Sequence, residues 1–270
     1  MNNFLPKVDI IIILLIGHLF GDFIFQTDIV FKLKIKSKKG LFLHSSIVFL
    51  TTFLFLYIFS KKLFFSLLIS ILTFISHFFI DLSKTKNNFD KGINFVLDQL
   101  LHFFVILFLS SISNFFVIES IKNIYVFKIL FLLVGLIFIL YFLKYLIRSL
   151  YEILKIKLVK DKYYYYMEDV EKIFLFIFSY MHGYFFLLLP FCIIPRIIYT
   201  IKNGNEYLYY DILISFLVSS FCGIFLRKVT LLYPFSFFEI FSLSFLFYIL
   251  FKILGFLLDR SILLFLKNKN

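Results

Sequence analysis

Apolar stretches long enough to cross a bilayer recur along the whole chain, separated by short polar segments. One helical crossing takes about 20 mostly apolar residues. On that basis the pattern predicts spans over roughly 8–31, 41–59, 63–82, 93–118, 124–147, 172–200, 207–226 and 236–265. The predicted fold is therefore all-α and integral to the membrane, a polytopic bundle of about eight transmembrane helices.

Two of these stretches carry residues that disturb a regular helix. Pro190 and Pro195 lie in the sixth and predict a kink or a break near its end, because proline removes a backbone hydrogen bond. Lys252, Asp259 and Arg260 interrupt the eighth. The number of crossings could therefore be seven or nine.

No hydrophilic block separates these stretches, so they are expected to form one unit in the membrane. We expect the membrane domain to cover residues 1–228, with four helices in residues 1–118, and residues 229–270 to add a C-terminal transmembrane segment. Residues 144–172 form the only sizeable polar piece, and their leucines and isoleucines recur at helical spacing. This segment is expected to lie on the cytoplasmic membrane surface, with Tyr163 to Tyr166 in the interfacial aromatic belt.

Positive charge marks alternate loops. The net charge is +12, but the lysines and arginines stand in short loops between apolar spans, so nucleic acid is not an expected partner. The first, third and fifth loops carry most of them, and by the positive-inside rule these loops are cytoplasmic and the N-terminus is outside. The first loop holds Lys32, Lys34, Lys36, Lys38 and Lys39.

Composition adds little chemistry to this pattern. Hydrophobic residues make up 62% of the chain and charged residues 16%, with a mean hydropathy of +0.99, so lipid is the main solvent. Cys192 and Cys222 lie inside apolar runs without a metal-ligand or redox spacing. Both are predicted to be buried, unreactive thiols.

Ionisable residues inside the first four spans are ordered at helical spacing. His18, Asp22 and Gln26 follow each other at steps of four, His77 precedes Asp81 by four, and Asp98 precedes His102 by four. Each set lines one face of its helix. The remaining candidates are His44 in the second span, Gln99 beside Asp98, and Lys84, which shares the face of Asp81 at the membrane boundary.

The predicted topology also places these groups at one depth. His18 falls near the middle of the membrane, and the others lie within about 15 Å of the cytoplasmic ends of their helices at 1.5 Å per residue. Short loops join neighbouring helices, so antiparallel packing would close the cluster. His182 stands apart from this set.

Three interpretations of the cluster remain open. Imidazoles and carboxylates from several helices can bind zinc or a similar divalent metal, and four histidines with three aspartates could hold one or two ions. The same groups could relay protons or pass a cation. They could also form a polar network that only fixes the helices together.

These residues resemble a known family of bacterial multi-pass membrane proteins, the domain of unknown function 3307. The matching segments are GHLFGDFIFQTD at 17–28, LHSS at 43–46, SHFFIDLSK at 76–84 and LDQLLH at 97–102. The resemblance implies a bacterial inner-membrane protein with characteristic polar positions at His18, Asp22, Gln26, His44, His77, Asp81, Lys84, Asp98, Gln99 and His102. The arrangement is also similar, more loosely, to membrane-bound metal-dependent hydrolases of the YdjM type.

The leading hypothesis is a membrane-embedded, metal-dependent hydrolase that acts on a lipid or other amphiphile from the cytoplasmic side. His18, Asp22, His44, His77, Asp81 and His102 are the predicted metal ligands, and Asp98, oriented by Gln99, is the predicted general base. The alternatives are a transporter or channel for protons or cations, and a non-enzymatic membrane protein that recruits a partner. Loop aspartates, expected at Asp90, Asp161 and Asp169, should have no role in any of these.

Overall fold

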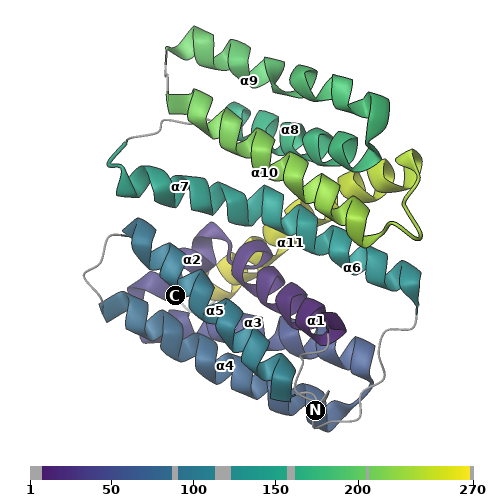
Figure 1. Cartoon of the computed structure of the whole chain (residues 1–270). Coiled ribbons are helices and arrows are strands. Elements are labelled where there is room, and N and C mark those ends of the chain that lie inside the picture. Colours follow the sequence, from purple (N-terminus) through teal and green to yellow (C-terminus); the bar gives the residue numbers. More distant parts are fainter. Residues whose placement is uncertain (1–7, 87–90, 113–122, 157–161, 205–206, 268–270) are drawn as a thin grey trace. The chain divides into compact units, whose positions relative to one another are not determined.

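Helices are the only regular elements in the part of the chain that the structure describes (Figure 1). This structure is a computed structural model, and it describes residues 8–86, 91–112, 123–156, 162–204 and 207–267. The predicted all-α fold is confirmed. The α-helices are α1 (Val8–Leu19), α2 (Asp28–Lys36), α3 (Lys38–Ser60), α4 (Leu63–Lys86), α5 (Lys91–Ile112), α6 (Ile124–Ile137), α7 (Leu143–Ile153), α8 (Lys162–Met181), α9 (Leu189–Asn203), α10 (Tyr207–Val229) and α11 (Phe237–Lys267). Three short helical turns join some of them, namely η1 (Phe20–Ile24), η3 (Phe138–Phe142) and η4 (Gly183–Leu188).

Among the described residues, seven helical segments are long and apolar enough to cross a bilayer. They cover Lys38–Ser60, Leu63–Lys84, Gly92–Ile112, Ile124–Ile153, Gly183–Asn203, Tyr207–Val229 and Phe237–Leu264. An eighth candidate is the pair Val8–Ile24 and Asp28–Lys36, counted together as one broken span. By length and composition the chain is therefore a multi-pass membrane protein, as predicted.

The first predicted span consists of two helices. The chain bends by 88° between η1, which ends at Ile24, and α2, which begins at Asp28. Thr27 caps α2, and its hydroxyl accepts a hydrogen bond from the Val30 amide at 3.5 Å. A threonine side chain in this position satisfies a backbone donor that would otherwise be free, so a new helix can start here.

The chain divides into two compact units. Unit 1 comprises Met1–Phe89, Ile93–Val134 and Ile249–Asn270, and unit 2 comprises Asp90–Gly92 and Gly135–Tyr248. Boundaries between the units fall inside α5, α6 and α11. The predicted interruption of the last span is absent, because α11 continues as one helix past Lys252, Asp259 and Arg260.

In unit 1, α3 packs against α1, α2 and α4 (Figure 1). The approach of α1 and η1 to α3 requires glycine at two positions. A Cβ atom at Gly17 would lie 2.7 Å from the Cα of Thr52, and one at Gly21 would lie 2.8 Å from the Cα of Val48. The Thr51 hydroxyl donates to the Gly17 carbonyl at 2.7 Å. Small residues four apart let membrane helices approach closely, and here they hold the polar face of α1 against α3.

An apolar layer closes one end of unit 1. Buried side chains from α1, α3, α4 and α5 form it, namely Ile10, Ile13, Leu14, Leu56, Phe65, Ile69, Ile106 and Leu109. They precede the histidines on α1 and α4 and follow them on α3 and α5. Because successive helices run in opposite directions, all of them lie toward the same end of the bundle.

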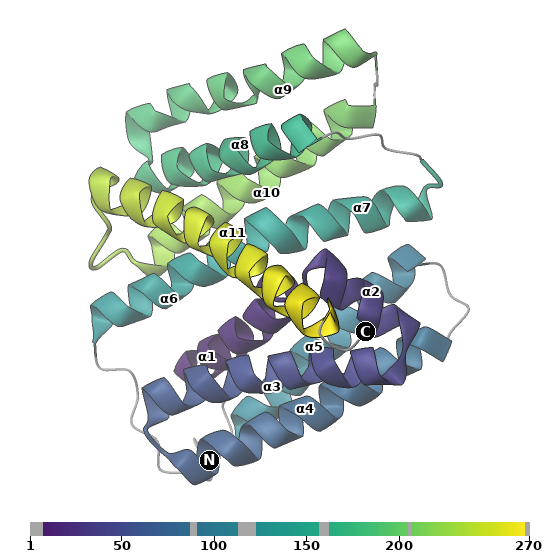
Figure 2. The same ribbon diagram turned by 180° about the vertical axis from the view of Figure 1, so that it is seen from behind.

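In unit 2, α8, α9 and α10 pack side by side (Figure 2). The sixth predicted span, 172–200, is broken here, but not where the prolines predicted. The chain leaves α8 at His182 and Gly183, which both have φ near 63°. Two consecutive residues with positive φ cannot continue an α-helix. Pro190 occupies the first turn of α9, where its missing N–H costs little, and Pro195 lies inside that helix.

The first part of the segment 144–172 lies in α7, at the end of the long helical stretch Ile124–Ile153. Leu143, Ile147 and Tyr151 of α7 are buried and pack with Ile214 and Val218 of α10. Protein therefore covers this face of α7, whereas Leu150 and Leu154, two of the regularly spaced leucines, are exposed. Residues 157–161 lie outside the described part of the chain.

Two residues predicted to lie at the surface are buried in α8. The side chain of Tyr164 is 0% exposed and donates to Oδ2 of Asp211 at 2.8 Å. Asp169 is 1% exposed and accepts from Lys144 Nζ at 2.7 Å. The prediction that Asp169 lies in a loop was wrong, since Asp169 lies in α8. Its carboxylate can be buried there because a lysine on a neighbouring helix compensates its charge. The two other aspartates expected in loops, Asp90 and Asp161, lie outside the described residues.

Candidate functional site

Five helical elements of unit 1 bring the predicted polar residues into one buried layer. His18 comes from α1 and Asp22 from η1, His44 from α3, His77 and Asp81 from α4, and Asp98 and His102 from α5. All seven side chains are buried, with exposed fractions between 0% and 5%. The spacing of four predicted in each helix therefore points its pair of groups into the interior of the bundle.

Asp22 lies between several nitrogen atoms of the cluster. Its Oδ1 is 2.8 Å from Nε2 of His77 and 3.1 Å from Nε2 of His44. Its Oδ2 is 3.5 Å from Nε2 of His18 and accepts from the Gln99 amide at 3.4 Å. Residues from four different helical elements thus meet at one carboxylate, which sits in the π-helical turn η1. Such turns are frequent at functional sites.

Asp81 and Asp98 form two further contact points. Asp81 Oδ2 lies 3.1 Å from Nδ1 of His77 and 3.5 Å from Nε2 of His44. Asp98 Oδ1 lies 3.4 Å from Nε2 of His102. Because His77 has a carboxylate at each ring nitrogen, only its imidazolium form could donate to both aspartates.

The histidine rings themselves lie close together. The ring centres are 5.4 Å apart for His18 and His77, 4.8 Å for His18 and His102, and 4.2 Å for His77 and His102. His44 is 5.0 Å from His77. The four imidazoles in this buried layer equal in number the four ligands of a tetrahedral zinc ion.

Three groups of side chains have the arrangement needed to hold a metal ion. Within each group the candidate ligand atoms all lie within 4.8 Å of one another. Ligands of one zinc ion are about 3 to 4 Å apart, so these spacings are close to those of a metal site. The groups are His18, His77 and His102; Asp22, His44 and His77; and Asp81, Asp98 and His102.

Several buried polar atoms of the cluster have no aligned hydrogen-bond partner among the described residues. They are Nδ1 and Nε2 of His44, Nδ1 of His77, both carboxylate oxygens of Asp81, Oδ1 of Asp98 and Nε2 of His102. Some of these atoms lie within 3.5 Å of an imidazole or carboxylate atom without hydrogen-bond geometry, and Asp81 Oδ2 also forms an ion pair with Lys34. A buried polar atom without a partner costs about 1–3 kcal/mol. A bound cation would satisfy these lone pairs, so the residues present fit a metal ion.

Lys34 is a member of the cluster that the sequence did not identify. Its Nζ lies 2.7 Å from Oδ2 of Asp81 and donates to the Gln26 side-chain oxygen at 3.1 Å. The pattern assigned Lys34 to a basic loop, whereas it lies on α2, which the 88° bend turns back toward the bundle. The threonine cap at position 27 was the available signal for a helix there. Gln26 accordingly lies at the edge of the cluster and not at its centre.

Lys84 and Gln99 also belong to the site. Lys84 Nζ donates to Oδ2 of Asp98 at 3.0 Å, with 32% of its side chain exposed. The Gln99 amide donates to the same oxygen at 3.2 Å. Because this amide also reaches Asp22, Gln99 links the two carboxylates.

The two ends of the bundle on either side of the cluster differ. The apolar layer described above closes the end of the bundle that holds Ile10 and Phe65. Near the opposite end a cavity of about 300 Å³ is lined by Lys34, Lys36, Lys38 and their neighbours on α2 and α3, together with Leu82 of α4. Lys34 therefore lines this basic cavity and also forms an ion pair with Asp81.

The close approach of α1 to α3 gives a direct test of how the site is assembled. Gly17→Ala is expected to destabilise the protein by about 1–3 kcal/mol, because the new methyl group meets the backbone of α3. Gly255→Ala is the matched control, since its Cβ would lie no closer than 3.6 Å to any atom and alanine favours a helix. Thermal unfolding in detergent measures both, and equal melting temperatures would contradict the packing.

Fold and site together define a multi-pass helical membrane protein with a buried centre of histidine, aspartate and lysine. Residues 10–131 match the model of a family described as "Protein of unknown function (DUF3307)", so this part of the chain is similar to that family. The match confirms the family resemblance and contains every predicted site residue. No curated protein and no solved structure matches the chain.

Proposed function

We propose that this protein is a membrane-embedded, metal-dependent hydrolase that acts on a lipid or other amphiphile. The observation that carries the proposal is the set of buried imidazole nitrogens and carboxylate oxygens within 4.8 Å of one another. Burying so many ionisable groups in a membrane bundle is costly, and such groups are normally retained for a task. A zinc-like divalent cation is the cofactor that this donor set favours.

The residues divide into ligands and groups that handle the substrate. His18, Asp22, His44, His77, Asp81 and His102 would hold one or two ions, which would supply Lewis-acid chemistry and activate water. Asp98 is the general base in this proposal, because it lies at the edge of the cluster with its Oδ2 held by Lys84 and Gln99. Lys34 would fix the orientation of Asp81.

The difference between the two ends of the bundle favours a hydrolase over a transporter. A conducting path would need polar groups toward both ends of the bundle, but the end beyond the histidines is filled by the apolar layer. The lysine-lined cavity at the other end would admit the polar part of an amphiphile. With the N-terminus outside, this opening would face the cytoplasm from a bacterial inner membrane.

Metal content is the measurement that tests the proposal. We expect detergent-purified protein, supplied with zinc, manganese, iron and nickel, to retain about one equivalent or more of one of these metals. The double variant His77→Ala/His102→Ala removes a member of each of the three ligand groups and should lose the metal. His182→Ala, in unit 2, should retain it. A wild-type content below about a tenth of an equivalent would exclude a metal centre.

A further inference from the structure

A second set of buried charges lies in unit 2, in a part of the chain that the proposed hydrolase site does not use. Arg196 of α9 is 0% exposed, and its Nε lies 3.2 Å from Oε2 of Glu171 on α8. Its Nη2 lies 3.7 Å from Oδ2 of Asp211, and the guanidinium lies over the ring of Tyr164. A buried guanidinium group needs opposite charge and hydrogen-bond acceptors around it. The groups near Arg196 therefore indicate what could bind there.

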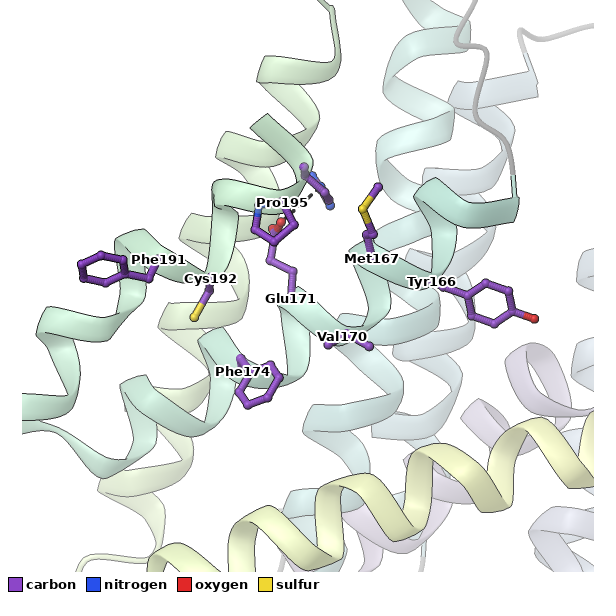
Figure 3. Close-up of a pocket in the computed structure, with 9 residues that line it drawn as sticks. Tyr166, Met167, Val170, Glu171, Phe174, Phe191, Cys192 and Pro195 are labelled. Atoms are coloured by element: carbon purple, nitrogen blue, oxygen red, sulfur yellow. Dashed lines mark ion pairs between the residues drawn. The ribbon is translucent and has the colours of Figure 1, made fainter. Parts of the chain in front are cut away.

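A cavity of about 420 Å³ opens beside this ion pair, between α8 and α9 (Figure 3). Small-molecule sites commonly enclose about 300–1,000 Å³, so the volume suits a ligand. Its walls are apolar and come from Met167, Val170, Phe174, Phe191, Cys192 and Pro195, while Glu171 and Arg196 supply the polar lining. The side chain of Phe191 is 65% exposed, whereas Glu171 is 4% exposed, so the cavity runs from an open apolar mouth to a buried charged end.

Both members of the pair retain unused hydrogen-bonding capacity. All three guanidinium nitrogens of Arg196 and both carboxylate oxygens of Glu171 lack an aligned hydrogen-bond partner among the described residues. The 3.2 Å contact between them is therefore an ion pair without hydrogen-bond geometry. A ligand that fits this end must accept hydrogen bonds from Arg196 and donate them to Glu171.

We propose that this cavity binds a zwitterionic amphiphile, a phospholipid whose headgroup carries both a phosphate and a primary ammonium group. The phosphate pairs with Arg196, the ammonium pairs with Glu171, and the acyl chain lies along the apolar walls. A headgroup with phosphate alone would meet two carboxylates, Glu171 and Asp211, around a single guanidinium. A zwitterion adds no net charge, so it completes the pair without a new uncompensated charge in low dielectric.

Competition between two lysolipids with the same acyl chain tests the headgroup. For full-length protein in detergent, we expect radiolabelled lysophosphatidylethanolamine to bind about tenfold more tightly than lysophosphatidylglycerol, which lacks the ammonium group. Glu171→Gln should reduce this preference by favouring the anionic lipid. Equal binding of both lipids to the wild-type protein would overturn the proposal.

A pair of variants on α9 tests the cavity without touching the charges. Cys192→Trp fills the cavity and should weaken lysophosphatidylethanolamine binding about tenfold or more, because the indole occupies the space of the acyl chain. Ile198→Trp is the matched control on the same helix, since Ile198 is exposed and does not line the cavity. Unchanged binding by Cys192→Trp, or equal losses in both variants, would overturn the assignment of this cavity.

Discussion

Asp22→Asn is expected to abolish metal-dependent stabilisation of the protein, together with any hydrolytic activity that depends on the metal. Both carboxylate oxygens of Asp22 face nitrogen atoms, from His77 and His44 on one side and from His18 and Gln99 on the other. Asparagine must turn its NH₂ group toward one of these sides, where it meets another nitrogen. The substitution also removes a negative charge that a cation requires.

Thermal unfolding with and without zinc measures this effect. Zinc at about a hundredfold excess over its Kd should stabilise the wild-type protein by about 2.7 kcal/mol, and the variant should gain almost nothing. Without metal, the unpaired imidazoles alone should lower the stability of the variant by about 1–3 kcal/mol.

Asp28→Asn is the control for Asp22→Asn, because Asp28 is exposed at the start of α2, only six residues along the chain. It should respond to zinc as the wild type does. If zinc stabilises wild-type protein and Asp22→Asn equally, Asp22 is not part of a metal site. If zinc stabilises neither and the variant only melts earlier, the cluster is a structural network instead.

Lys172→Met is expected to destabilise the protein more than any other single change considered for unit 2. Lys172 and Glu168 form an ion pair one turn apart on α8, and both side chains are 0% exposed. Removing one partner leaves the Glu168 carboxylate buried without this cation, which typically costs about 3–5 kcal/mol. Unfolding in detergent, followed by the loss of helical circular dichroism, measures the change.

An exposed pair with the same spacing is the control for this prediction. Arg148 and Glu152 are also four residues apart, with Nε and Oε1 3.3 Å apart, but their side chains are 73% and 38% exposed. Arg148→Met should change stability by less than about 1 kcal/mol. Adding Glu168→Met to Lys172→Met should recover part of the loss, since the buried charge is then gone. Equal effects of Lys172→Met and Arg148→Met would show that burial does not decide the cost.

Local periodicity explains why so much of the candidate site could be predicted. A spacing of four places His18 and Asp22, or His77 and Asp81, on one face of a helix whatever surrounds it. Alternating helix directions and short loops then bring these faces to one depth. These are properties of consecutive residues, so no tertiary information was needed to expect a cluster.

The position of Lys34 in the site depends on packing, for which the sequence offers only a local signal for a helix start at Thr27. Lys34 reaches Asp81 only because the chain turns by 88° after η1 and starts a second helix. Its position among other lysines near a membrane boundary fitted a topogenic loop equally well. The buried state of Asp169 likewise depends on Lys144, 25 residues away in the sequence.

The sequence by itself determined that this is an all-α multi-pass membrane protein and which ionisable residues are buried together in its first four spans. Hydropathy and helical spacing carry that information because lipid requires every backbone group to be bonded within a helix. Tertiary structure alone decided where the first and sixth spans break, which glycines bring α1 against α3, and which charges of unit 2 are compensated. Lipid-facing and protein-facing positions in a membrane are equally apolar, so hydropathy cannot distinguish them. Only the packing of one helix against another does.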